Sequence, residues 1–128
     1  MKRQLFGVLG VFILLGWLGG VSFAATTRVS VNIPFSFMAD GKSYPAGSYE
    51  ILEESSQLRI RSVNSTAQGN YLNYYTRTFQ LPGSETMVVF DKVGDQAYLA
   101  EIHIAGQDGF HLQGAPGPHS HVMIKASR

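Results

Sequence analysis

The chain has 128 residues and a formal net charge of +1, and it contains no cysteine. This length suits one domain, and without cysteine the chain has neither a disulfide framework nor a cysteine nucleophile. Basic and acidic residues are nearly balanced, so the sequence lacks the basic stripe that is typical of nucleic-acid-binding domains.

The first 24 residues have the three-part order of a secretory signal peptide. Lys2-Arg3 is positively charged, residues 5–18 form an uncharged apolar run, and Ser22-Phe23-Ala24 places small residues at the −3 and −1 positions of a cleavage site. We therefore predict a signal-peptide helix, cleavage near Ala24, and a secreted or periplasmic mature chain. The alternative is an uncleaved anchor, since the extended apolar run approaches the roughly 17–20 residues that a membrane span needs.

Cleavage would remove two of the ten basic residues and change the formal net charge from +1 to −1. The remaining chain of about 104 residues is long enough to bury a core of its own. We expect an all-β domain over residues 25–113. Residues 114–128 form a C-terminal segment that is punctuated by glycine and proline and ends in a short strand.

Apolar and polar residues alternate from Arg28 to Met38, which predicts a strand with one buried face. The apolar positions are Val29, Val31, Ile33, Phe35 and Phe37. Pro34 has no N–H to donate, so we expect a sheet edge or a bulge at that point.

Residues 48–54 and 57–63 form a predicted hairpin around Ser55-Ser56. In that register Ile51 lies opposite Ile60 on the inner face, and Glu50 lies opposite Arg61 on the outer face. An apolar pair and a charge pair, each on its proper face, favour this pairing.

A second hairpin is predicted for residues 87–93 and 96–105, because Gly94-Asp95 suits a two-residue type II′ turn. With this loop, one face carries Val88, Phe90 and Leu99, and the other carries Met87, Val89, Ala100 and Ile102. Two apolar faces indicate either a central strand or an apolar surface for a partner.

Seven or eight strands, spaced about ten residues apart and without intervening helices, favour an all-β fold. We expect a single-domain antiparallel β-sandwich or a small β-barrel. A candidate partner surface combines Phe90 and Leu99 with aromatic side chains from the strand-forming stretch 71–79, namely Tyr71, Tyr74 and Tyr75.

Four segments carry a resemblance to a known family: residues 31–37 (VNIPFSF), residues 41–49 (GKSYPAGSY), Val89-Phe90-Asp91-Lys92 and Leu99-Ala100-Glu101-Ile102. Together they resemble a family of small secreted bacterial proteins of unknown function. In that family a signal peptide precedes a V-x-V/I-P-F-x-F strand, a G-K-x-x-P-A-G-x-Y turn and a late hairpin. The resemblance implies an extracytoplasmic β-domain and transfers no catalytic residue, and residues 114–128 lie outside it.

The best candidate site is a group of histidines near the C-terminus. His119 and His121 are separated by one residue, so they share one strand face about 6.5–7 Å apart. Glu101 and His103 are related in the same way, and Met123 continues the face of His121.

Imidazole is a good ligand for zinc, copper and nickel. If the final strand lies beside residues 97–105, then Glu101, His103, His119 and His121 converge on one zinc or copper ion. The alternative is that these side chains are solvated on outward strand faces.

Catalytic motifs are absent from the sequence: it has no Gly-x-Ser-x-Gly elbow, and the adjacent Glu53 and Glu54 point to opposite faces. We therefore expect a non-enzymatic exported β-scaffold without a cofactor, which acts as a structural or interaction module of the cell envelope with a protein or glycan partner. The membrane would be involved only during export. The alternative function is a small extracytoplasmic metal-binding protein that uses the histidine cluster.

Overall fold

The computed structural model describes residues 26–79 and 85–128, so the predicted signal peptide lies outside the described residues. Within these ranges the secondary structure is entirely β, and no described helix is long and apolar enough to cross a membrane. The strands are β1 (Thr27–Ile33), β2 (Phe37–Ala39), β3 (Lys42–Tyr44), β4 (Gly47–Glu54), β5 (Gln57–Ser62), β6 (Asn70–Leu72), β7 (Thr76–Thr78), β8 (Met87–Val93), β9 (Gln96–Ile104), β10 (Gln107–His111) and β11 (Ser120–Lys125).

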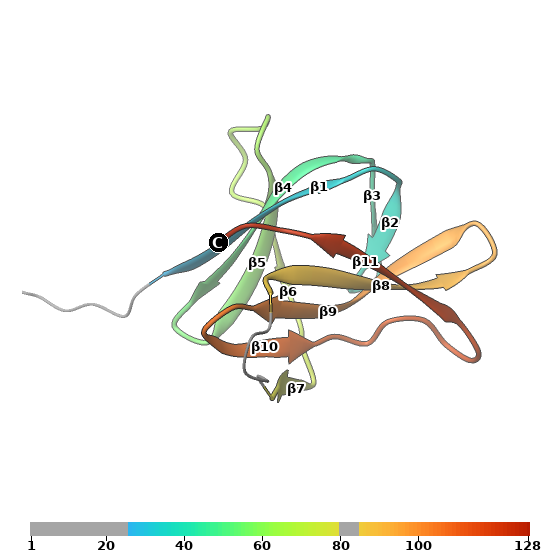
Figure 1. The fold of residues 1–128 in the computed structure, drawn as a ribbon. Helices are drawn as coiled ribbons and strands as arrows, with labels where there is room; N and C mark the ends of the chain where they lie inside the picture. The colour runs from blue at the N-terminus through green and yellow to red at the C-terminus, as the bar shows by residue number, and fades with distance from the viewer. Residues whose placement is uncertain (1–25, 80–84) are drawn as a thin grey trace, which may run out of the picture.

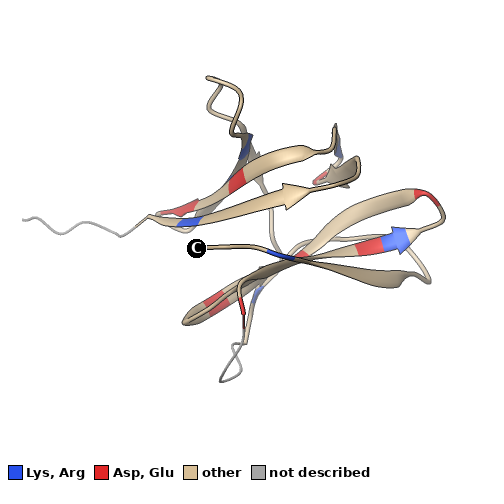
Figure 2. Ribbon diagram, turned by 45° about the horizontal axis from the view of Figure 1, so that its top comes forward, with Lys and Arg blue, Asp and Glu red and all other residues tan. Residues whose placement is uncertain are grey.

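These strands form two facing sheets, which confirms the predicted all-β fold and shows a sandwich instead of a small barrel (Figures 1 and 2). The described residues form eleven strands, more than the seven or eight predicted, because several strands are only three residues long. One sheet has the order β1-β4-β5-β6. The other has the order β11-β8-β9-β10-β7, and the β2–β3 hairpin joins it through a single parallel pairing of β2 with β9. Acidic and basic residues are interspersed over both sheets (Figure 2).

The two sheets meet at one corner, where the C-terminal segment lies beside β1 (Figure 1). Ser30 of β1 and Ser127 form two backbone hydrogen bonds of 2.8 and 2.9 Å. Because Ser127 lies just after β11, this bridge anchors the C-terminal end of β11 to the opposite sheet.

The segment predicted as one strand over residues 28–38 is instead two strands in different sheets. Val29, Val31 and Ile33 fill the core from β1, as the alternation predicts. The chain leaves the first sheet at Pro34, which has no N–H for a ladder, and enters the second sheet with Phe37.

The hairpin of β4 and β5 has the predicted register, with Ile51 opposite Ile60 and Glu50 opposite Arg61. Arg61 donates to Glu50 at 2.7 Å. Ser55 and Ser56 both have positive φ angles, of 51° and 68°, as a type I′ turn requires.

The hairpin of β8 and β9 turns at Gly94, but a bulge changes its faces. Val89 lies opposite Glu101 and Phe90 lies opposite Leu99, so Ala100 is an extra residue in β9. From Glu101 to the end of β9, each side chain therefore points to the face opposite to the one that a regular ladder would give it.

Ile102 consequently lies in the core opposite Val88, and the prediction that it shares a face with Val89 is wrong. Glu101 and His103 take the outer positions beside Val89 and Met87. A ladder counted from the Gly94-Asp95 turn with a regular two-residue period misses this exchange, although Glu101 and His103 alternate with the apolar Ile102 and Ile104.

Aromatic side chains form the centre of the core, where Phe37 contacts Tyr44, Tyr49 and Phe90. Burial raises the pKa of both tyrosine hydroxyls, although a hydrogen bond from Asn70 partly lowers that of Tyr44. The protonated Tyr49 hydroxyl donates to the backbone oxygen of Pro45 at 2.6 Å, which ties the start of β4 to the preceding turn.

Replacing Gly109 by alanine is expected to destabilise the fold by about 1–3 kcal/mol, the usual cost of overpacking. A Cβ at this position would overlap the backbone oxygen of Ile102 and lie 2.6 Å from Thr78 Oγ1, which accepts a hydrogen bond from the Gly109 amide. Urea unfolding would measure the loss. Gly47→Ala is the control, because the φ angle of Gly47 is not positive and its added methyl would make only an ordinary contact of 3.8 Å with the Tyr49 ring. Equal stability of Gly109→Ala and wild type would show that the contact at Gly109 is not tight.

Candidate metal centre

The candidate metal centre is built around Asp91, which follows four apolar residues in strand β8 and is its single carboxylate. Its side chain is only 8% exposed. The segment that follows β10 covers it: the Leu112 amide donates to Ala100 at 2.7 Å, and the Ala115 amide donates to Asp91 Oδ2 at 3.0 Å. Gly114 has no side chain to fill the space taken by this oxygen. The carboxylate is therefore fixed by the backbone on one side.

Two histidines contact the other oxygen of the same carboxylate. His119 Nε2 lies 3.3 Å from Asp91 Oδ1, and His121 Nδ1 lies 3.1 Å from it. His121 is the direct cross-strand partner of Asp91, and His119 lies just before β11. One ligand atom from each of the three residues lies within 4.8 Å of the other two.

A hydrogen bond sets the ring orientation of His119. Its Nδ1 lies 2.8 Å from the backbone oxygen of Gly117, which only accepts hydrogen bonds, so Nδ1 carries the proton. In a neutral ring Nε2 then presents a lone pair toward Asp91. A lone pair beside a carboxylate oxygen is repulsive unless a cation, either a proton or a metal ion, lies between them.

Two of the three separations between these ligand atoms match a tetrahedral metal site, and the third, between the two histidine nitrogens, is within 4.8 Å. Bonds of about 2.0–2.1 Å from a metal to nitrogen and oxygen place neighbouring ligand atoms about 3.3–3.4 Å apart. The two contacts to Asp91 measure 3.1 and 3.3 Å. Two imidazoles and one carboxylate are ligands for zinc or copper, and they leave a fourth position for water.

The predicted convergence of Glu101 and His103 with the two later histidines does not occur. The final strand β11 pairs with β8, so β8 separates it from β9. Glu101 and His103 form their own pair, with 2.7 Å between Oε1 and Nε2. Asp91 takes their place, and the sequence signal that points to it is a single carboxylate after four apolar residues.

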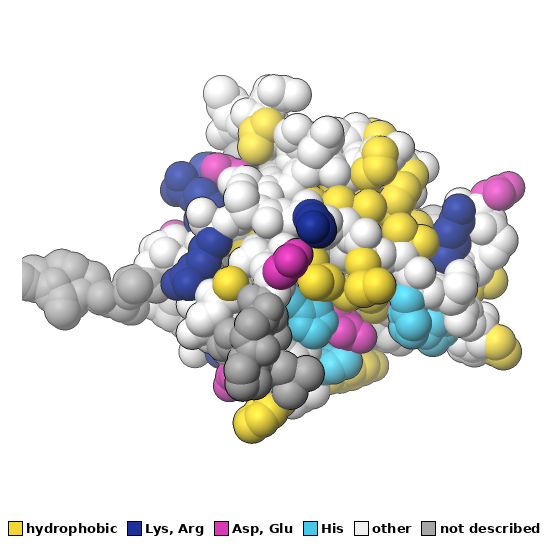
Figure 3. Space-filling model, in the orientation of Figure 1, with side chains coloured by type: hydrophobic (Ala, Val, Ile, Leu, Met, Phe, Trp, Pro, Cys, Tyr) yellow, Lys and Arg dark blue, Asp and Glu magenta, His cyan; other side chains and the backbone are white. Residues whose placement is uncertain are grey.

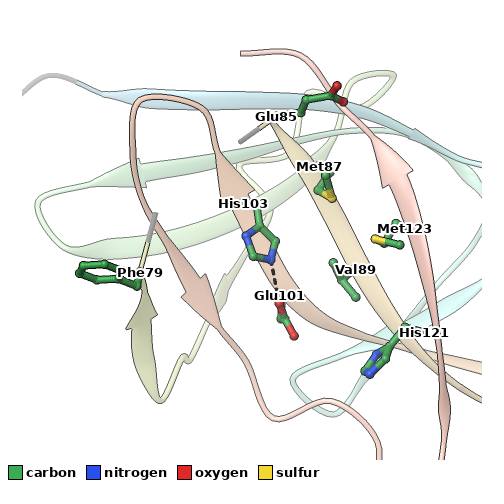
Figure 4. Close-up of a pocket in the computed structure, with 8 residues that line it drawn as sticks. All are labelled: Phe79, Glu85, Met87, Val89, Glu101, His103, His121 and Met123. Atoms are coloured by element: carbon green, nitrogen blue, oxygen red, sulfur yellow. Dashed lines mark hydrogen bonds and ion pairs between the residues drawn. The ribbon is translucent and has the colours of Figure 1, made fainter. Parts of the chain in front are cut away.

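A groove of about 390 Å³ lies next to this centre on the outer face of β8, β9 and β11 (Figure 4). It is lined by Phe79, Glu85, Met87, Val89, Glu101, His103, His121 and Met123. In Figure 4 the Glu101–His103 hydrogen bond lies on one side of the groove and Met123 on the other. Histidine side chains gather in two groups on this face of the molecule (Figure 3).

The predicted partner surface divides into buried and exposed residues. Phe90 and Leu99 are fully buried in the core, so they cannot contact a partner. Tyr74 is half-buried with its ring edge-on to Phe110, whereas Tyr71 and Tyr75 are 62% and 74% exposed. Of the residues in the predicted partner surface, only Tyr71 and Tyr75 are exposed enough to contact a partner.

Comparison with protein-family models, with curated proteins and with solved structures gave no match to this chain. Function must therefore be argued from the chemistry of its sites, because a β-sandwich by itself supports many unrelated functions.

Proposed function

We propose that this chain is an exported, non-enzymatic β-domain that binds a transition-metal ion through Asp91, His119 and His121. The observation that carries the proposal is that two imidazole nitrogens lie within 3.3 Å of one oxygen of a buried carboxylate. Export is proposed from the order of charged, apolar and small residues at the N-terminus, which agrees with the resemblance to small secreted bacterial proteins.

Supporting hydrogen bonds favour a metal ion at this cluster, in which Asp91 is buried and both histidines are exposed. Asp91 Oδ2 and His119 Nδ1 are both held by backbone groups, of Ala115 and Gly117 respectively. Such supporting hydrogen bonds fix the orientation of ligands in metal sites, and their loss typically reduces metal affinity about 10- to 100-fold. The cluster thus has both a set of ligands and a set of groups that hold them in place.

A proton is the competing cation, because a doubly protonated His119 would satisfy the same contact with Asp91. The two cases differ in what they require. A proton on His119 stabilises only the contact between His119 and Asp91. A metal ion binds all three side chains at once, and it requires that the ligand nitrogens of both histidines carry no proton.

Added Zn²⁺ or Cu²⁺ is expected to raise the melting temperature of the purified protein. An ion present at 100 times its dissociation constant stabilises the folded state by about 2.7 kcal/mol. Replacing His119 and His121 together by alanine should abolish this rise. Scanning calorimetry with and without each ion measures both effects.

The control is His111→Ala, which removes a histidine outside the cluster and should keep the full response. A rise that persists in the double variant would place the metal elsewhere. If neither ion changes the melting temperature of the wild-type protein, the metal-binding proposal is wrong, and only the interaction-module function remains as a proposal.

A further inference from the structure

A strip with two exposed tyrosines runs along the side of the sandwich where β6 and β7 end the two sheets. Tyr71 lies on β6 and Tyr75 immediately precedes β7. The residues between them alternate: Leu72 and Tyr74 turn inward, and Asn73 is exposed. Tyr71, Asn73 and Tyr75 therefore present their side chains to solvent, and we call these three residues together with Asp40 the tyrosine strip.

Two hollows lie along the tyrosine strip, one beside each tyrosine. The first, of about 190 Å³, is walled by Tyr71 and includes Ser56, Gln57 and Asn73. The second, of about 60 Å³, is walled by Tyr75 and includes Asp40, Asn73 and Gln113. Asn73 and Tyr74 line both hollows, so the two form one continuous surface of amide, hydroxyl and carboxylate groups between aromatic rings.

The floor of the strip is held rigidly. The Asn73 backbone amide and its side-chain amide both donate to Asp40 Oδ2, at 3.2 and 3.0 Å. The Tyr74 hydroxyl donates to the backbone oxygen of Ser56 at 3.0 Å, and its ring packs edge-on to Phe110. Among the described residues, Asn73 Oδ1 and Asp40 Oδ1 make no hydrogen bond, so both remain acceptors.

This combination suits a carbohydrate. A pyranose ring has an apolar C–H face that stacks on an exposed aromatic ring, and its rim of hydroxyls pairs with planar amides and carboxylates. A peptide ligand would instead need apolar pockets for its anchoring side chains, and the larger hollow, beside Tyr71, is lined mainly by polar groups. We infer that the tyrosine strip binds a glycan chain, with Tyr71 and Tyr75 each stacking on a sugar ring.

This inference is independent of the metal centre, because the tyrosine strip shares no residue with it. The test is co-sedimentation of the purified protein with three insoluble polysaccharides: cellulose, chitin and peptidoglycan. We expect wild-type protein to sediment with at least one of them. Tyr71→Ala with Tyr75→Ala should reduce the bound fraction about 10-fold, the effect of losing two aromatic contacts.

Conservative variants separate stacking from loss of structure. Tyr71→Phe with Tyr75→Phe keeps both rings and should retain binding, whereas the alanine pair loses it at an unchanged melting temperature because both side chains are exposed. The His119→Ala, His121→Ala variant should bind the polysaccharide like wild type, so failure of one proposal is distinguishable from failure of the other.

Two results would overturn the inference. One is sedimentation with none of the three polysaccharides. The other is binding that the alanine pair leaves unchanged, which would place the glycan elsewhere. If the alanine pair abolishes binding of an immobilised proline-rich peptide while wild type ignores all three polysaccharides, the strip is a peptide site and the glycan assignment is wrong.

Discussion

Replacing Phe37 by alanine is expected to lower the free energy of unfolding by about 3–5 kcal/mol, the usual range for removing a buried phenyl ring. The Phe37 side chain is 0% exposed. Its ring stacks on Tyr44 with centroids 5.2 Å apart and meets Tyr49 and Phe90 edge-on, each at 5.4 Å. The substitution would leave a cavity among three rings that β3, β4 and β8 hold in place, so the surrounding side chains can collapse only little into the space.

Phe35→Ala is the matched control. Phe35 is only half-buried and contacts Phe90 edge-on at 5.0 Å, in the connection between β1 and β2. Its loss should cost clearly less than the loss of Phe37. Urea unfolding of both variants, with equal slopes against denaturant, measures the difference. Equal losses would mean that the two positions are packed alike, which would contradict the burial described here.

Local regularity explains which parts of this fold the sequence predicts. In β1 the alternation of Val29, Val31 and Ile33 identifies the buried face, because side chains in a strand alternate with a period of two. The register of the β4–β5 hairpin is predicted correctly, because the Ser55-Ser56 turn fixes the pairing of the residues on either side of it. Both features depend on neighbours in the chain.

Features that depend on distant partners were not predictable. The alternation continues through Pro34 to Phe37, and it does not show that the chain changes sheets there. Likewise, the alternation of Glu101, Ile102 and His103 marks Ile102 as inward, but a ladder counted from Gly94-Asp95 without the bulge at Ala100 places Ile102 on the face of Val89. Four strands of only three residues are also too short for a periodicity to reveal.

The candidate site shows the same division. The spacing of His119 and His121 places them on one face whatever their neighbour is, and the structure keeps them together. Their third partner depends on strand order. Pairing β11 with β8 brings Asp91 opposite His121, whereas pairing with β9 would have brought Glu101 and His103.

Strand β11 is an edge strand whose side chains are at most half-buried. Val122 and Ile124 only pack against the core from outside. One end is held by the Ser30–Ser127 bridge. The other end is held through the contacts of His119 and His121 with Asp91. An ion at these three residues would therefore join β11 and the preceding loop to β8 where apolar burial contributes least.

Asp91→Asn is expected to remove the response to metal while keeping the shape of the site. The amide oxygen still accepts the Ala115 hydrogen bond, but the charge that a cation needs is lost. A 100-fold weaker affinity would reduce the stabilisation by an ion from about 2.7 to about 0.4 kcal/mol at the same concentration. The melting temperature of the variant should then barely change on addition of Zn²⁺.

Hydrogen exchange locates the same effect in the chain. In the wild-type protein, Zn²⁺ should slow exchange of the β11 amides and of the β8 amides that pair with them, because local opening of the edge strand would require loss of the ion. The β4–β5 hairpin lies in the other sheet and should be unaffected. In Asp91→Asn the slowing should disappear. If instead Zn²⁺ protects all strands equally, or protects β11 in the variant as well, the ion does not act through Asp91, and the three-residue centre is not the metal site of this protein.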